Sequence, residues 1–184
     1  MNTLAKQTQI SSVHTVKKYL GYLEEAFMFF RIKRFSWKTG SQQSFNQKIY
    51  CYDNGFFMAK AFRFSYDYGR LLENLVAVEL IKRSFYDQSK VFFWKNKEQE
   101  EVDFVIQRGT KFTELIQVCW SSGTLRTRQL KIRALLKASQ DLKCINLKVI
   151  THNEHGREKA SWYGMEGEVI FVPAVKWLTE PGPE

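Results

Sequence analysis

Asp103 is the residue of this sequence whose position most needs a chemical explanation. It lies in the apolar run Val102 to Ile106, which is typical of a buried strand. A carboxylate there is costly to bury unless it is paired with a cation or binds a metal ion. Glu101, two residues earlier, shares a strand face with Asp103 because side chains alternate along a strand. The pair therefore predicts an acidic site on one face of this strand.

The segments around Asp103 predict a mixed α/β fold. Residues 90–120 predict three strands, at 91–94, 102–106 and 112–119, joined by polar turns. Alternation places Val102 and Phe104 together on the face opposite Asp103, and Leu115, Gln117 and Cys119 together on one face of the third strand. Further elements are expected in the order helix 68–86, the three strands, helix 125–139, strand 145–151, loop 152–162 and strand 168–172. This order indicates a mixed sheet with a helix on each face.

The first 54 residues predict a separate module. Val13, Val16, Leu20, Leu23 and Phe27 recur at helical spacing, so a helix is expected over 13–27, capped by Ser11 or Ser12. A helix end over 2–9 precedes it, and strands at 29–37 and 48–52 would form the wing of a partial winged helix. A further first helix would have to precede residue 2, so we expect the natural chain to start earlier. The predicted division is 1–54 for this module, 55–180 for the second domain and 181–184 for a disordered tail.

Positive charge is concentrated in this first module. The chain carries 28 Lys and Arg against 19 Asp and Glu, and residues 1–50 hold eight of the former and two of the latter. Such an excess favours an anionic partner. DNA phosphates could contact the basic face, or that face could simply be solvated on a linker or protein-docking module. Under the first alternative the contacting residues would be Thr15, Lys17, Lys18, Arg31, Lys33 and Arg34, together with Arg128 and Lys131 of the second domain.

Cysteine usage and hydropathy exclude several classes of protein. Cys51, Cys119 and Cys144 are widely spaced and odd in number, which excludes a zinc motif and argues against a disulfide framework. Apolar runs are too short to cross a membrane, and the N-terminus has no signal-peptide pattern. We therefore expect a cytoplasmic protein with no membrane partner.

These elements in this order resemble the PD-(D/E)XK nuclease superfamily. More closely, the chain is similar to the C-terminal region that follows the ATPase module in a bacterial and archaeal family of AAA-type ATPases, in which a winged helix precedes a nuclease-like fold. The resemblance implies an ATPase module as a partner in the full-length protein, because no phosphate-binding loop motif occurs here. It is carried by TVKKYLGYLEEA, KIYCYDNG, GRLLENLVAVEL, VFFWKNKEQEEVDFVI, ELIQVCW and the stretch from TRQLKIRALLKAS to LKVIT.

The resemblance also implies a catalytic site with two positions changed. Active members of the superfamily bring together a helix Glu, a strand Asp and a Glu-x-Lys pair to hold Mg²⁺. In this sequence the matching positions are Glu73, Asp103, Gln117 and Cys119, so the last pair lacks both its carboxylate and its ammonium group. Two replacements are conceivable: Glu101 as a further metal ligand, and Arg128 or Lys131 as a displaced positive charge.

Three functions therefore remain open. The first is a catalytically silent module that binds DNA or protein. The second is an active Mg²⁺-dependent nuclease with a relocated base. The third is a regulatory or homo-oligomerisation domain in which Glu73 and Asp103 merely pair with basic side chains. Fold alone does not decide among them.

Overall fold

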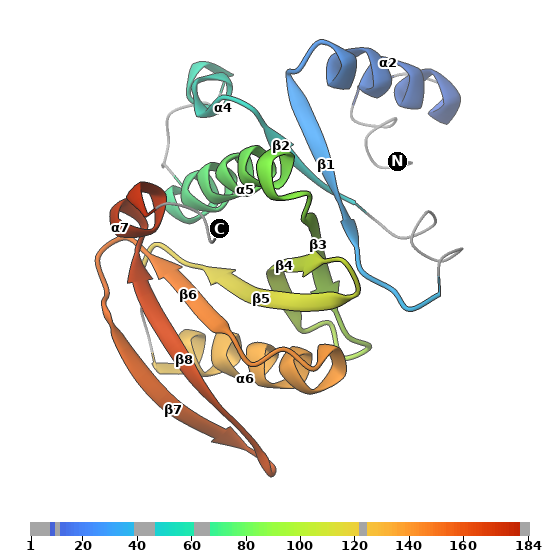
Figure 1. Cartoon of the computed structure of the whole chain (residues 1–184). Coiled ribbons are helices and arrows are strands. Elements are labelled where there is room, and N and C mark those ends of the chain that lie inside the picture. Colours follow the sequence, from blue (N-terminus) through green and yellow to red (C-terminus); the bar gives the residue numbers. More distant parts are fainter. Residues whose placement is uncertain (1–7, 10–11, 39–46, 61–66, 122–124, 181–184) are drawn as a thin grey trace.

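Eight strands form one mixed sheet in the computed structural model, which describes residues 8–9, 12–38, 47–60, 67–121 and 125–180 (Figure 1). The strands lie in the order β2-β1-β3-β4-β5-β6-β8-β7. Pairing is parallel for β1 with β3, β5 with β6 and β6 with β8, and antiparallel elsewhere, so the mixed α/β fold is confirmed. The strands are β1 (Phe29–Arg34), β2 (Lys48–Cys51), β3 (Lys90–Lys95), β4 (Glu101–Arg108), β5 (Lys111–Val118), β6 (Leu147–Thr151), β7 (Gly156–Trp162) and β8 (Met165–Pro173).

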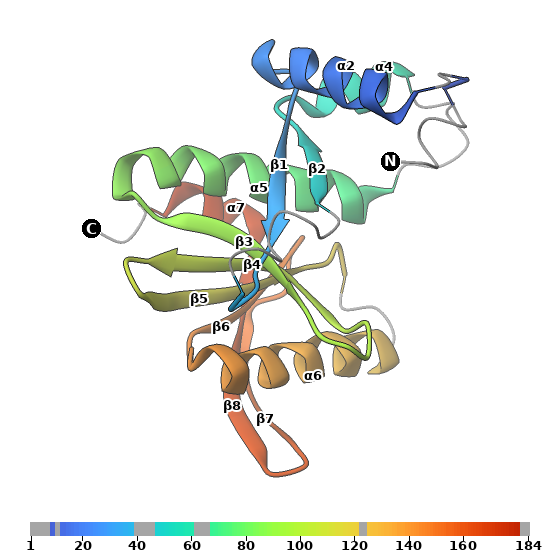
Figure 2. The same ribbon diagram turned by 90° about the vertical axis from the view of Figure 1, so that its right-hand side faces the viewer.

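Helices cover both faces of this sheet, as Figure 2 shows. Helices α5 (Tyr68–Asp87) and α7 (Ala174–Thr179) pack on one face, and α6 (Leu125–Leu142) packs on the other. Helices α2 (Val13–Glu25) and α4 (Asn54–Lys60) lie beside the β1–β2 hairpin. Within the described residues, no helix combines the length and apolar character needed to cross a membrane.

The hydrophobic core has two main layers, one on each side of the sheet. Leu72 and Val76 of α5 pack with Phe104 and Ile116 on one face. On the other face Leu135 of α6 belongs to a cluster with Leu115 and Leu147. Because helices cover both faces of the sheet, the central strands β4 and β5 carry buried apolar side chains on both sides.

The predicted pairing of the two N-terminal strands is confirmed, and the hairpin also joins the main sheet. Phe30 pairs with Tyr50 in an antiparallel arrangement. The far end of β1 pairs in parallel with β3, through Lys33 with Phe92. The β1–β2 hairpin is therefore part of the same sheet as the strand that carries Asp103. The helix end expected over residues 2–9 lies mostly outside the described residues, as does Ser11.

Helix α2 buries less of its apolar stripe than its spacing predicts. Val16 and Leu20 are buried against β1, whereas Leu23 is 39% and Phe27 is 72% exposed. The helix ends at Glu25, and Phe27 takes a left-handed backbone conformation (φ 53°) that turns the chain into β1. Ser12 occupies the N-cap position without a capping side-chain hydrogen bond.

The prediction of a loop over 152–162 was wrong, because residues 156–162 form strand β7 at the edge of the sheet. β7 pairs only with β8 and leaves most of its side chains exposed or half-buried. One face of β7 is exposed and the other is only half-buried, so its sequence, GREKASW, lacks the apolar alternation of a core strand.

The two core layers lead to a matched stability prediction. Leu135 and Leu130 both lie on α6, but Leu135 is fully buried and Leu130 is 45% exposed. Leu135→Ala should lower the free energy of unfolding by about 2–5 kcal/mol through reduced burial and a cavity. Leu130→Ala should lower it by less than about 1 kcal/mol. Urea denaturation followed by circular dichroism measures both, and equal decreases would contradict this packing.

Candidate functional site

A β-bulge places Asp103 in the candidate site. Between the pairs Phe92–Val105 and Trp94–Val102, the single residue Phe93 of β3 faces both Asp103 and Phe104 of β4. The extra residue breaks the side-chain alternation of β4. Val102 therefore packs in the α6 layer and Phe104 in the α5 layer, so the expectation that they share a face was wrong.

Asp103 occupies the gap in which β4 and β5 separate. The regular pairing of these strands ends at Phe104 with Ile116. Beyond it, the Val118 backbone N–H donates to Asp103 Oδ2 over 2.9 Å, so a side chain takes the role of a strand neighbour. Asp103 as a whole is 7% exposed, and its carboxylate receives two ammonium groups, Lys48 Nζ at 3.1 Å on Oδ1 and Lys131 Nζ at 3.2 Å on Oδ2.

Lys48, at the start of β2, is the centre of the cluster. Its Nζ lies 3.0 Å from Glu73 Oε1, 2.7 Å from Glu101 Oε1 and 3.1 Å from Asp103 Oδ1. Tyr50, two residues further on the same strand, donates its hydroxyl to Glu73 Oε1 over 2.7 Å. The structure therefore brings together the three predicted acids Glu73, Glu101 and Asp103, and it does so around an ammonium group.

Asn74 holds β2 over helix α5 and thereby positions this cluster. Its side chain accepts from the Cys51 backbone N–H and donates to the Cys51 carbonyl, both over 2.8 Å, and it also donates to Asn54. Asn74 is buried to 3% exposure, so its polar atoms are satisfied in place. Because Glu73 is the adjacent residue on α5, the same contact fixes Glu73 beneath Lys48 and Tyr50.

Gln117 and Lys131 complete the cluster on the α6 side. Gln117 Nε2 donates to the Glu101 carbonyl over 2.7 Å, and Gln117 Oε1 accepts from Lys131 Nζ over 3.1 Å. Helix α6 is tied to the β3–β4 turn, because Arg133 and Lys137 both pair with Glu100. This anchor positions Lys131, which lies on the same helix.

Of the two residues considered as a displaced positive charge, only Lys131 reaches Asp103. Arg128 pairs with Glu154 and Glu158 at 2.9 and 2.7 Å, and its guanidinium stacks on Phe171. Cys119 is buried, and burial raises the pKa of its thiol. Glu114 lies on the opposite face of β5 from Gln117 and pairs with Lys148.

The groups of the cluster shift one another's pKa values. Burial alone would lower the pKa of Lys48, but Asp103, Tyr50, Glu73 and Glu101 raise it well above its ordinary value. Burial would raise the pKa of Asp103, but Lys131, Lys48 and the Val118 N–H hold it below its ordinary value. Burial and Glu73 raise the pKa of Tyr50, against the opposing effect of Lys48. The Lys48 ammonium group and the Asp103 carboxylate are therefore charged at neutral pH.

The donor set does not fit Mg²⁺ as it stands. Mg²⁺ requires oxygen ligands in near-octahedral geometry at about 2.0–2.1 Å. The point at which the three carboxylates converge is taken by Lys48 Nζ, and Gln117 supplies only a neutral carbonyl that already accepts from Lys131. In the part of the chain that the structure describes, no group of three or more Asp, Glu, His or Cys side chains has a spacing that would hold a metal ion.

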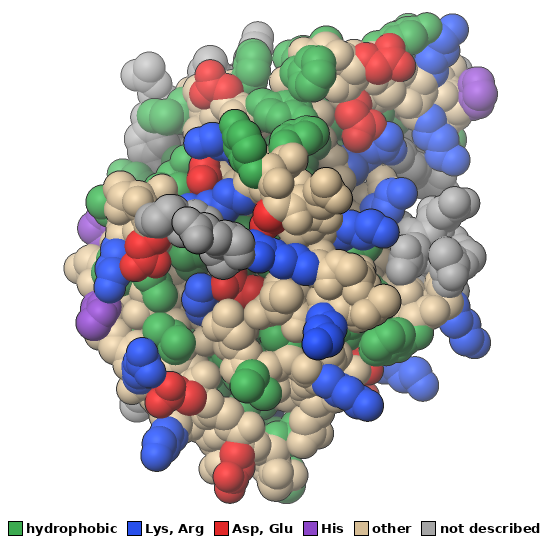
Figure 3. All heavy atoms as spheres, in the orientation of Figure 1, with side chains coloured by type: hydrophobic (Ala, Val, Ile, Leu, Met, Phe, Trp, Pro, Cys, Tyr) green, Lys and Arg blue, Asp and Glu red, His purple; other side chains and the backbone are tan. Residues whose placement is uncertain are grey.

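The residues predicted to meet DNA differ in their exposure and in their contacts within the chain. Lys17, Lys18 and Lys33 are exposed, and basic side chains gather over α2 and the adjacent part of β1 in Figure 3. Thr15 is half-buried. The other four have partners within the chain: Arg31 pairs with Glu24, Arg34 donates to the Lys95 carbonyl, and Arg128 and Lys131 are engaged as described.

Sequence reasoning missed Lys48 and Tyr50 as site residues. Their positions, two apart on a predicted strand, indicate that they share a face. That pattern does not say which face, or that the hairpin lies over α5. The contacts join Lys48 to a residue 55 positions away, which only the fold reveals.

Acid titration should reveal the pairing of Asp103. Because its folded-state pKa lies below the ordinary value of about 3.9, its ion pairs stabilise the fold above that pH and are lost as pH falls. Asp103→Asn should lower the free energy of unfolding at pH 7 by about 3–5 kcal/mol, since two ammonium groups lose a partner. The difference from the wild type should shrink below about pH 4. Unfolding measured from pH 7 to 3 tests this, with Glu98→Gln as an exposed-carboxylate control; a constant difference would refute it.

Comparisons with known proteins place this chain among uncharacterised relatives. A family model described as a domain of unknown function (DUF4143) matches residues 68–165, and another (DUF8612) matches residues 1–66. An uncharacterised protein of Methanocaldococcus jannaschii is 37% identical over 164 residues, which cover 88% of this chain and 35% of the relative. An uncharacterised protein of Haemophilus influenzae is 31% identical over 108 residues, covering 58% and 26%. The chain thus spans about a third or less of the length of these relatives. Since the first model matches more than half of the chain, this protein belongs to the family that shares the domain of unknown function DUF4143.

Proposed function

We propose that this chain is a PD-(D/E)XK nuclease-like domain without nuclease activity, which binds DNA as an accessory part of a larger protein. The observation that carries the proposal is the Lys48 ammonium group within 3.1 Å of Glu73, Glu101 and Asp103. Metal-dependent hydrolysis needs carboxylates that are open to a cation and its bound water. Here these carboxylates are engaged by a side chain of the protein itself.

The same proposal extends to the larger protein. The relatives are about three times as long as the matched region or longer, so this domain accompanies other parts in them. An AAA-type ATPase module is the accompanying part that we propose, on the resemblance carried by the sequence. In that arrangement the domain would hold DNA while the ATPase supplies the energy for movement.

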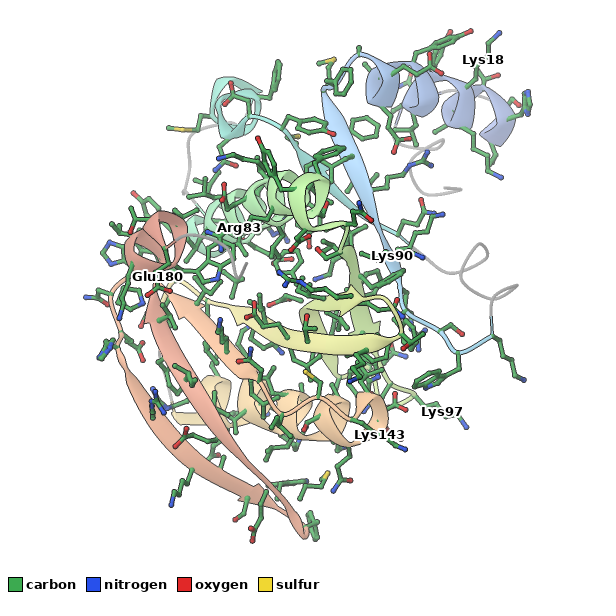
Figure 4. All side chains as sticks on the ribbon, viewed as in Figure 1. Lys18, Arg83, Lys90, Lys97, Lys143 and Glu180 are labelled. Atoms are coloured by element: carbon green, nitrogen blue, oxygen red, sulfur yellow. The ribbon has the colours of Figure 1, made fainter. Side chains whose placement is uncertain are left out.

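DNA is the favoured partner because exposed lysines lie in the N-terminal part of the chain, where Lys and Arg most outnumber Asp and Glu. Lys17, Lys18 and Lys33 are exposed on α2 and β1. Contacts from such residues to phosphates give binding that is independent of sequence and sensitive to salt. Figure 4 shows that Lys18 lies far from Lys97 and Lys143, so the two ends of the molecule can be compared directly.

A second function is favoured by one observation. Lys131 Nζ lies 3.2 Å from Asp103 and 3.1 Å from Gln117, close to the strand position at which active nucleases of this superfamily carry a lysine. Such an ammonium group could support a nucleophile or a developing charge. This would make the chain an active nuclease with a relocated lysine.

Metal titration with labelled DNA separates the two functions. We expect the wild-type chain to bind single- or double-stranded DNA without cleaving it at any Mg²⁺ or Mn²⁺ concentration. Metal-dependent cleavage that disappears in Asp103→Ala would overturn the proposed function. If Lys131→Met also abolished that cleavage, the relocated lysine would be supported. Absence of both binding and cleavage would point to a protein partner instead.

Removal of the exposed lysines should weaken DNA binding at every sequence alike. The triple variant Lys17→Ala, Lys18→Ala and Lys33→Ala should also reduce the slope of log affinity against log salt by about 2–3, at about 0.9 for each phosphate that is no longer neutralised. The matched control replaces Lys97, Lys111 and Lys143, which are exposed elsewhere. Fluorescence anisotropy at several salt concentrations measures both variants. An equal effect of the two triple variants would show that net charge alone matters.

A further inference from the structure

Three aromatic rings stack at one end of the sheet, outside the cluster around Asp103. Trp120, which follows β5, stacks with Tyr68 at the start of α5, with ring centroids 4.8 Å apart and an interplanar angle of 29°. Trp120 also stacks with His152, which follows β6, at 4.2 Å and 20°. Figure 1 shows the start of α5 beside the ends of these two strands. Three segments that are distant in the sequence therefore contribute to one ring stack.

Backbone hydrogen bonds fix the position of two of these rings. The His152 backbone N–H donates to the Trp120 carbonyl over 3.0 Å, and the Cys119 N–H donates to the Ile150 carbonyl over 3.0 Å. These bonds extend the parallel pairing of β5 with β6 beyond its last pair, Val118 with Ile150. Rings that are already held in place lose little conformational freedom when a ligand binds, so the stack is preorganised.

The stack is open to solvent. Tyr68 is 49% and Trp120 is 38% exposed, and His152 is also exposed. Tryptophan is highly buried on average, and Tyr and Trp are enriched where proteins bind other molecules. The exposed aromatic surface is therefore available to a further planar group.

The stack lies close to the acid cluster along two elements of the fold. Trp120 follows Gln117 by three residues, and Tyr68 precedes Glu73 by five residues on α5. These separations correspond to about 10 Å along a strand and about 7.5 Å along a helix axis. Arg70, on the first turn of α5, pairs with Asp67 at 3.1 Å in an exposed ion pair, which is weak enough to be exchanged for a phosphate.

We propose that Tyr68, Trp120 and His152 form a stacking site for an unpaired base, so that the DNA recognised by this chain is single-stranded. Every base has a planar face that stacks on aromatic side chains with little dependence on sequence. In duplex DNA these faces are covered by neighbouring bases, and only the base edges are open in the grooves. This inference rests on the proposed function, because it names the form of DNA that the domain binds.

Trp162 provides a matched control for Trp120. It is 37% exposed, but it lies on β7 and contacts Tyr163 edge-on at 5.1 Å. Trp120→Leu should weaken the binding of a labelled single strand by about 5- to 100-fold, which corresponds to the loss of stacking with one base. Trp162→Leu should leave this binding unchanged. Fluorescence anisotropy in the presence of EDTA measures both variants.

Two further comparisons separate stacking from charge. Trp120→Leu should leave duplex affinity and the salt dependence of binding unchanged, whereas the triple lysine variant reduces the salt dependence. Trp120→Phe should retain most of the single-strand affinity because it keeps an aromatic ring. If circular dichroism shows that Trp120→Leu does not fold, Tyr68→Leu decides, with a loss of single-strand affinity expected and an unchanged affinity contradicting the site.

Three results would overturn the inference. They are equal effects of Trp120→Leu and Trp162→Leu on single-strand binding, an equal loss of single-strand and duplex affinity in Trp120→Leu, and a wild-type chain that binds no single strand. Because binding is measured without free metal ions, the result is independent of nuclease activity. Metal-dependent cleavage by the wild type would refute the proposed function and leave the stacking site in place.

Discussion

Burial of Asp103 is the constraint that the surrounding structure must satisfy. An ionised carboxylate on a residue that is only 7% exposed persists only where charge and hydrogen bonds surround it. Its partners come from three directions: Lys48 from the N-terminal hairpin, Lys131 from α6 and the Val118 backbone from β5. The three parts are thereby held in a fixed arrangement. Removing either lysine would leave the buried carboxylate with one counter-charge fewer, so the cluster links the halves of the chain more firmly than an exposed ion pair would.

Much of the fold could be predicted because it follows from local patterns. Helix α5 and the three strands β3, β4 and β5 have dense apolar runs separated by polar turns, and their positions were expected within a few residues. Asp103 stood out for the same reason, as a carboxylate in an apolar strand. Glu73, Glu101 and Gln117 were named from the family resemblance or from side-chain alternation, and the structure brings all of them to Asp103.

The rest could not be predicted because it depends on contacts between distant segments or on local irregularity. The bulge opposite Phe93 moves Phe104 to the other face, and no residue type in β4 predicts this bulge. In the sequence, Lys48 is one more basic residue in a basic module. Its role in the site follows only from the pairing of β1 with β3. Charge counting has the same weakness: it groups Arg31 and Arg34 with Lys33, although only Lys33 is exposed.

The two edges of the sheet have a consequence for self-association. Open strand edges can pair with another molecule and lead to aggregation. At one edge β2 is only four residues long, and the Asn74 side chain occupies the backbone N–H and carbonyl of Cys51. At the other edge β7 carries the consecutive charged residues Arg157, Glu158 and Lys159, which would have to lose water to meet a second strand. The polar composition of β7 prevented its prediction as a strand. The same composition therefore protects this edge from pairing with other molecules and from aggregation.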